Sequence, residues 1–144
     1  MHTFGDRFMQ PIPVGAQGSF SLLVTERHLA NRFKDAMLPA VFSTPVMVML
    51  MENAALNAIK PYLDPNESAV GTRVDVIHLA ATPVGMTATA HAEVTFVDGR
   101  RIEFKVTATD GMDTIGTATH ERMVIDMVRF NEKLAKKAVA ATQR

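Results

Sequence analysis

The sequence predicts an α+β domain in which a curved antiparallel sheet wraps around one long central helix. One observation is a helical segment, residues 44–60, that is apolar over most of its circumference. The other is a run of strand-like segments that follows it, with few further helical signals. A helix that is apolar on most sides must be covered, and here only a sheet is available to cover it. At 144 residues the chain is interpreted as a single domain, 1–144, with one core.

The first predicted element is a strand over residues 18–25, where apolar and polar residues alternate. Residues 1–13 before it are interpreted as an N-terminal extension. Residues 26–43 are irregular and long for a connection in a small domain, so we expect a lid-like loop or pocket wall there.

The central helix is expected to begin at Thr44, with Thr44 as its N-cap and Pro45 at the first helical position. It is expected to run to about Lys60, because Pro61 then forces a kink or an end.

Four strands are predicted after the helix, joined in an antiparallel meander, and a short amphipathic helix follows them. Asp98-Gly99 is a tight hairpin signal, and Asp110-Gly111 marks a second turn. The residues after position 127 are interpreted as a C-terminal helix and tail, 128–144. The strand and helix ranges are 70–80, 86–97, 101–109, 114–126 and 128–139.

This order of elements is that of the hotdog fold, in which a sheet curls around a central helix. The inward face of residues 86–97 carries several alanines, which suits a sheet pressed closely against a helix. Hotdog domains normally pair edge to edge as dimers, with active sites where the subunits meet. We therefore expect a homodimer.

The composition excludes several classes of function. Fifteen basic residues balance fifteen acidic ones, so we expect neither nucleic acid nor a membrane surface as a partner. The absence of cysteine excludes disulfides, thiolate zinc sites and a cysteine nucleophile, and it fits a reducing compartment. The longest uncharged run, 36–51, is too short to span a membrane and contains two prolines. We expect a cytoplasmic protein.

Glu52 is the most informative single residue, because it lies on an apolar side of the predicted helix. A carboxylate directed into a core is costly unless it is paired, hydrogen-bonded or protonated. One interpretation is a structural glutamate satisfied by backbone amides or an arginine; the other is a catalytic acid or base. Its neighbours on the same face are Val48, Met49, Ala55, Leu56 and Ile59.

His78 shares a strand face with valines and is expected to point towards the helix. A single histidine on an apolar face is more often a core residue than a reactive one. Together with Glu52, however, it can form the acid–base pair that hydrolysis requires.

Thr44 lies at a helix start, where unpaired N–H groups and the positive end of the helix dipole can hold a carbonyl oxygen. Thr44 and Glu52 are eight residues apart, about 12 Å of helix rise, so they are not expected to meet within one chain. Antiparallel central helices in a dimer would bring them together at a shared site. His120-Glu121-Arg122 lacks the spacing of metal ligands, and we expect no metal.

Taken together, these segments resemble the fluoroacetyl-CoA thioesterases, a branch of the hotdog thioesterases. The resemblance runs from about residue 14 to residue 137. The stretches that carry it are Val41-Phe42-Ser43-Thr44, Met51-Glu52, Val70-Gly71-Thr72 followed by His78, Ala80-Ala81-Thr82-Pro83-x-Gly85-Met86-Thr87, Val97-Asp98-Gly99-Arg100-Arg101, Asp110-Gly111-x-Asp113 and Gly116-Thr117-Ala118-Thr119-His120-Glu121-Arg122.

The resemblance implies a catalytic set made of Thr44, Glu52 and His78, the residues already selected from the pattern. It also implies that Gly71 and Arg122 line the substrate site.

Phe33, Leu38 and Phe42, in the lid-like segment, are further candidates for substrate contact. The family has a phenylalanine lid at positions that correspond to Asp35 and Leu38 here. Discrimination of fluoroacetyl from acetyl groups is therefore expected to be weak.

The function predicted from this sequence is hydrolysis of small or short-chain acyl-CoA thioesters. Glu52 would activate water or attack the carbonyl, His78 would move protons, and Thr44 with nearby amides would hold the carbonyl oxygen. No cofactor is expected beyond the coenzyme A of the substrate. The alternatives are a hotdog dimer that binds an acyl-CoA or small acid without turnover, and a dehydratase or hydratase. The Asp-x-Asn-Pro-x-His run expected of one dehydratase branch is absent.

Overall fold

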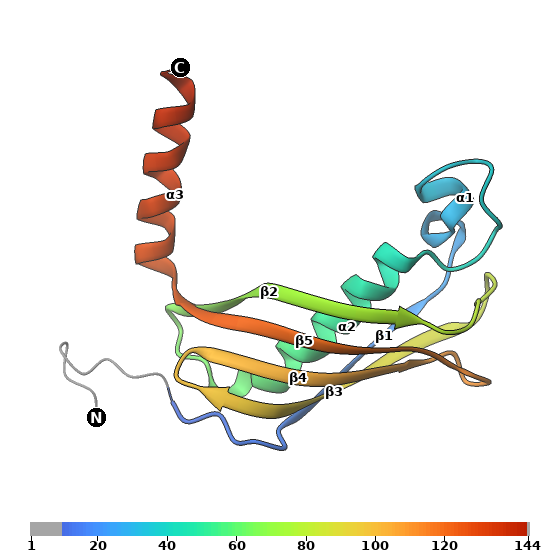
Figure 1. The fold of residues 1–144 in the computed structure, drawn as a ribbon, viewed down its shortest axis with the longest axis horizontal. Coiled ribbons are helices and arrows are strands. Elements are labelled where there is room, and N and C mark those ends of the chain that lie inside the picture. Colours follow the sequence, from blue (N-terminus) through green and yellow to red (C-terminus); the bar gives the residue numbers. More distant parts are fainter. Residues whose placement is uncertain (1–9, 144) are drawn as a thin grey trace.

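The computed structural model describes residues 10–143, so residues 1–9 of the predicted N-terminal extension and residue 144 of the predicted tail lie outside it. Within residues 10–143 the chain forms five strands and one long buried helix, with shorter helical segments and a C-terminal helix (Figure 1). The elements in order are β1 Gln17–Leu23, η1 Glu26–His28, α1 Ala30–Phe33, α2 Thr44–Ile59, η2 Lys60–Tyr62, β2 Glu67–His78, β3 Thr87–Asp98, β4 Arg101–Thr109, β5 Thr114–Asp126 and α3 Met127–Thr142.

The strands form one antiparallel sheet in the order β1-β3-β4-β5-β2. β1 and β2, which flank α2 in the sequence, therefore lie at opposite edges. α2 crosses one face of the sheet obliquely (Figure 1). The predicted hotdog arrangement is confirmed. The predicted meander of all four later strands is wrong for the first of them: β3, β4 and β5 are neighbours in chain order, whereas β2 pairs with β5 and not with β3.

Small residues allow α2 to lie close to β1 and β3. Ala88, Ala90 and Ala92 of β3 are all buried on the helix side. On β1, a Cβ added at Gly18 would lie 2.3 Å from the backbone nitrogen of Ala58. This face of the helix is therefore packed backbone against backbone.

The predicted helix cap is wrong by one residue. Ser43 has extended dihedrals (φ −78°, ψ 147°) and is the N-cap, so Thr44 is the first helical residue and Pro45 the second. Proline is tolerated there because early amides have no intrahelical partner. The other end agrees with the prediction, since α2 ends at Ile59 and a 3₁₀ turn containing Pro61 follows.

The 26–43 segment is more ordered than the sequence pattern indicates, because it contains η1 and α1. Backbone hydrogen bonds fix its far end, one within the segment and one to the chain that follows β2. The amide of Ser43 donates to the carbonyl of His28 at 2.9 Å, and the amide of Phe42 donates to that of Thr82 at 2.8 Å. These contacts orient the chain as it enters α2.

α3 projects away from the sheet (Figure 1). The predicted range 128–139 is extended at both ends, to Met127–Thr142. Its predicted apolar face is uncovered in the single chain, with Phe130 38% and Leu134 54% exposed. None of the helices among residues 10–143 is long and apolar enough to cross a membrane.

Candidate functional site

Thr44 and His78 meet at one end of the sheet. Thr44 is the first residue of α2, and His78 is the last residue of β2. The hydroxyl of Thr44 lies 2.7 Å from Nδ1 of His78, within hydrogen-bond distance. Two residues 34 positions apart in the sequence thus form one polar unit at the start of the central helix.

The second ring nitrogen of His78, Nε2, is buried and has no hydrogen-bond partner among the described residues. Burial lowers the pKa of His78, and the backbone of Ala80 offsets part of this effect. The neutral imidazole is therefore favoured, which is the form that can accept a proton at neutral pH.

A cavity of about 350 Å³ opens beside this pair. It is bounded by the 26–43 segment, the start of α2 and the end of β2. Its lining includes Leu38, Phe42, Ser43, Thr44 and His78. Leu38 and Phe42, two of the candidates for substrate contact, thus line this cavity. Phe33 is 54% exposed and does not line the cavity.

Amides at the start of α2 add donors to this end of the molecule. The first intrahelical bond runs from the amide of Met47 to the carbonyl of Ser43, at 3.0 Å. The N–H groups of Thr44 and Val46 precede it in the helix and have no intrahelical acceptor. A hydroxyl, a neutral imidazole and free amides are a suitable set of groups for a carbonyl oxygen.

Glu52 lies halfway along α2. The apolar pattern predicted that it is directed into the core, and this prediction is wrong. Its side chain is 36% exposed. Glu52 is partly exposed because the sheet covers only part of the circumference of α2. Ala55 and Ile59 are buried, whereas Met49 beside Glu52 is 41% exposed.

Glu52 is instead paired with Arg122 of β5, whose Nη1 lies 3.9 Å from Oε2. Gly71 of β2 packs against the same carboxylate, since an added Cβ would lie 2.7 Å from Oε2. The resemblance implies that Glu52 is catalytic and that Gly71 and Arg122 line the substrate site. The structure shows that these three residues are neighbours.

His120 is a member of this cluster that the sequence reasoning missed. Its Nε2 lies 3.1 Å from Nη1 of Arg122, and the residue is 3% exposed. The sequence analysis rejected His120 as a metal ligand and included it in a stretch that carries the family resemblance, but gave it no role in the site. The strand alternation contained the useful signal, because it places His120 and Arg122 on the inward face of β5.

The chain thus carries two polar clusters, Thr44–His78 and Glu52–Gly71–His120–Arg122. Their members on α2 are eight residues apart, about 12 Å along the helix axis. The structure does not bring Glu52 to Thr44 or His78 within one chain.

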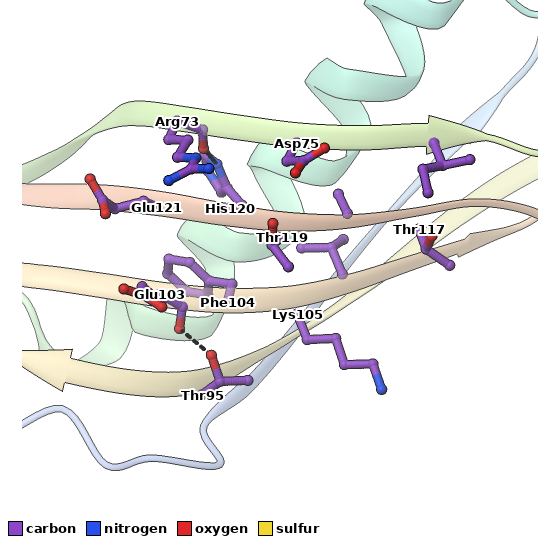
Figure 2. A pocket seen from close by; sticks show the side chains of 13 residues that line it. Arg73, Asp75, Thr95, Glu103, Phe104, Lys105, Thr117, Thr119, His120 and Glu121 are labelled. Carbon is purple, nitrogen blue, oxygen red and sulfur yellow. Dashed lines mark hydrogen bonds between the residues drawn. The ribbon is translucent and has the colours of Figure 1, made fainter.

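A larger hollow, of about 640 Å³, lies over the outward face of the sheet (Figure 2). Alternating charged and hydroxyl side chains line it, including Asp75, Lys105 and Thr119. Thr44, Glu52 and His78 do not line it, but His120 of the second cluster does. Among residues 10–143 no group of three or more His, Cys, Asp or Glu side chains is arranged to hold a metal ion.

Comparison with known proteins yields consistent matches. A family model described as fluoroacetyl-CoA-specific thioesterase matches residues 24–128. A fluoroacetyl-CoA thioesterase of Streptantibioticus cattleyicolor is 48% identical over 117 residues, covering 81% of this chain and 84% of that protein.

Two solved structures extend the comparison. One of a fluoroacetyl-CoA thioesterase superposes with a TM-score of 0.82 at 41% identity, covering 88% of this chain and 98% of the other. A Thermus thermophilus protein described as a thioesterase superfamily member gives a TM-score of 0.88 at 27% identity, covering 94% of this chain and all of the other.

Proposed function

This chain belongs to the family of fluoroacetyl-CoA-specific thioesterases, and from that premise we propose that it hydrolyses acyl-CoA thioesters with small or short acyl groups. It is a thioester hydrolase of the hotdog superfamily. The observation that carries the proposed site is the 2.7 Å contact between Thr44 and His78 at the wall of a cavity of about 350 Å³. A cavity of that size is in the range of small-molecule binding sites.

In the proposed reaction the thioester carbonyl oxygen is held by the Thr44 hydroxyl and the free amides at the start of α2. Glu52 either takes a proton from a water molecule that attacks the carbonyl carbon or attacks that carbon itself, and the carbon–sulfur bond breaks as the tetrahedral intermediate collapses. In the second case water then hydrolyses the acyl–Glu52 anhydride and releases the acid. His78 accepts a proton from water and passes it to the leaving thiolate. This chemistry uses side chains and water, so we propose that it requires no cofactor.

The active site is proposed to be shared between two copies of the chain. Glu52 is about 12 Å along α2 from Thr44, so one chain does not supply a complete set. The side of α2 that carries Glu52 is uncovered by its own sheet, and Met49 there is 41% exposed. A second copy packed antiparallel against this side would bring its Glu52 to the Thr44–His78 pair. We therefore propose a homodimer with two active sites at the interface, acting in the cytoplasm.

Thiol release from an acyl-CoA panel tests the activity directly. Glu52→Gln preserves size and is expected to reduce kcat/KM at least a hundredfold, within the usual range for a lost general base. His78→Ala and Thr44→Ala are expected to be impaired as well. If Glu52→Gln hydrolyses every substrate as fast as wild type, the mechanism is wrong. Saturable acyl-CoA binding without thiol release would favour the non-catalytic alternative.

Mixing two inactive variants tests the shared site. A dimer of one Glu52→Gln subunit and one His78→Ala subunit contains one complete set only if each site draws on both chains. Random exchange should then restore about a quarter of wild-type activity, since half the dimers are mixed and each has one intact site. Mixtures that stay inactive after confirmed subunit exchange would place the whole site within one chain.

Oxygen-18 incorporation tests whether Glu52 acts as the nucleophile. Label found in the Glu52 carboxylate after a single turnover in labelled water identifies a covalent acyl intermediate.

A further inference from the structure

His120 lies at the centre of the polar cluster on the inward face of β5. It is 3% exposed, and its ring stacks on Phe104 of β4 with centroids 5.7 Å apart. On its other side lies β2, where the register shifts between Gly71 and Arg73. The irregularity in β2 brings the carbonyl of Arg73 to the ring of His120 (Figure 2).

The two partners of His120 determine both its tautomer and its charge. Nδ1 lies 2.7 Å from the Arg73 carbonyl oxygen, which only accepts hydrogen bonds, so Nδ1 must carry a proton. Nε2 lies 3.1 Å from Nη1 of Arg122, which only donates, so Nε2 must present its lone pair. The geometry is satisfied only by the neutral imidazole protonated at Nδ1.

Arg122 is held on more than one side. Its Nη2 donates to the carbonyl of Ala69 at 2.7 Å, and its Nη1 donates to His120. The same Nη1 faces Glu52 at 3.9 Å. The guanidinium is therefore fixed between a backbone carbonyl and a histidine, and its remaining charge is directed towards the carboxylate on α2.

We propose that His120 is a positioning residue: as the neutral Nδ1–H tautomer it holds the Arg122 guanidinium beside Glu52, and its protonation releases that guanidinium. This inference rests on the proposed catalytic role of Glu52. A protonated His120 would set an N–H against the N–H of Arg122 and one cation against another. The hydrogen bond would be lost, and Arg122 would no longer support Glu52.

The surroundings favour the neutral form. Burial lowers the pKa of His120; the bond to the Arg73 carbonyl raises it, and the charge of Arg122 lowers it again. The charged groups that act on the ring are Glu52 from α2, with Arg122 and Glu121 from its own strand. From β4 the uncharged ring of Phe104 stacks on the imidazole. His120 therefore gains its charge only in acid.

Nuclear magnetic resonance of the wild-type protein with ¹⁵N-labelled histidine tests the tautomer independently of activity. The His120 resonances are identified by their absence from His120→Gln. We expect a neutral ring with Nδ1 protonated at pH 7.5. A ring protonated at Nε2, or one charged at this pH, would overturn the proposal.

Two substitutions separate the two hydrogen bonds. In His120→Gln the amide oxygen can replace Nε2 and accept from Arg122, whereas in His120→Asn the amide nitrogen can replace Nδ1 and donate to Arg73 only. We expect His120→Asn to lose about tenfold to a hundredfold in kcat/KM for acetyl-CoA at pH 8, the effect of losing a hydrogen bond to a charged group. His120→Gln should stay within about threefold of wild type. Because glutamine does not titrate, the activity ratio of His120→Gln to wild type should rise as the pH falls from 8 to 5.

Phe104→Leu is the matched control, since it removes the stacked ring and leaves both hydrogen bonds of His120. It should lower the thermal stability without changing the shape of the pH profile. Equal kcat/KM for the glutamine and asparagine variants, or a ratio that is constant with pH, would overturn the inference while Glu52→Gln remained inactive. A fully active Glu52→Gln would overturn the proposed function instead.

Discussion

Replacing Gly71 by alanine would test how closely the Glu52 carboxylate packs against β2. The added Cβ would lie 2.7 Å from Oε2 of Glu52, about 0.7 Å short of the 3.4 Å at which ordinary contact begins. Gly71 does not have a positive φ, so alanine fits its backbone. The carboxylate is the end of a flexible side chain that is 36% exposed, and it can move aside.

The expected result is a loss of activity with little loss of stability. A displacement approaching 1 Å at a catalytic group can cost about a hundredfold in rate, so we expect kcat/KM to fall by about tenfold to a hundredfold. The free energy of unfolding should change by less than about 1 kcal/mol, because no backbone has to move. Thiol release measures the first quantity and thermal unfolding the second.

Gly18→Ala is the control with the opposite expectation. Its Cβ would lie 2.3 Å from the backbone nitrogen of Ala58 and 2.6 Å from the carbonyl oxygen of Ala54, and the backbone of a buried helix does not yield easily. We expect a loss of about 3 kcal/mol or more, as for other overpacked sites. This corresponds to roughly 6 to 12 °C in Tm for a chain of this size.

A double substitution shows whether Gly71→Ala acts through Glu52. In a Glu52→Gln background the alanine should cause little additional loss, because two changes at one contact are not additive. The reasoning is refuted if Gly71→Ala keeps wild-type kcat/KM, or if its effect is just as large in the Glu52→Gln protein.

Three further predictions follow from the structure. Leu38 lines the cavity and Asp35 is exposed, so neither position supplies the phenylalanine lid of the family. Fluoroacetyl-, acetyl-, propionyl- and butyryl-CoA should therefore show graded kcat/KM values, with steps of about 1–3 kcal/mol per methylene. A thousandfold preference for fluoroacetyl over acetyl would contradict this prediction. Burial would raise the pKa of Asp110, but hydrogen bonds from the amides of Asp113 and Met112 and from the Thr82 hydroxyl hold it below the ordinary value of 3.8. The stabilisation is therefore complete above that value and is lost as the pH falls through the lower pKa of the folded state, so Tm should fall less steeply in acid for Asp110→Asn than for wild type. The buried Ser43 hydroxyl has no partner among the described residues, so Ser43→Ala should change the free energy of unfolding by less than about 0.5 kcal/mol. Denaturant titration measures this change, and a loss near 1 kcal/mol would indicate that the Ser43 side chain caps α2.

The sequence by itself determined the elements and their order. Hydrophobic periodicity and turn signals are local, so an apolar helix at 44–60 and four alternating strands were readable without any knowledge of their pairing. The same patterns selected Glu52 and His78 because each is a polar residue in an apolar row. The resemblance to a family added Gly71 and Arg122 as residues of the substrate site.

Only the tertiary structure decided which of these groups meet. His78 reaches Thr44 because β2 ends beside the start of α2, and Arg122 reaches Glu52 because β5 pairs with β2 in one register, with a shift after Gly71. A slip of one residue would turn Arg122 to the opposite face of the sheet.

Exposure was equally beyond the sequence. The apolar neighbours of Glu52 suggested a buried side chain. The sheet curls only part of the way around α2, however, and the Glu52 side chain is 36% exposed. The residue at a helix cap depends on dihedral angles, which moved the cap from Thr44 to Ser43. Periodicity shows which residues share a face, whereas long-range packing decides what covers that face. The chemistry of His120 and Arg122 depends on this long-range packing.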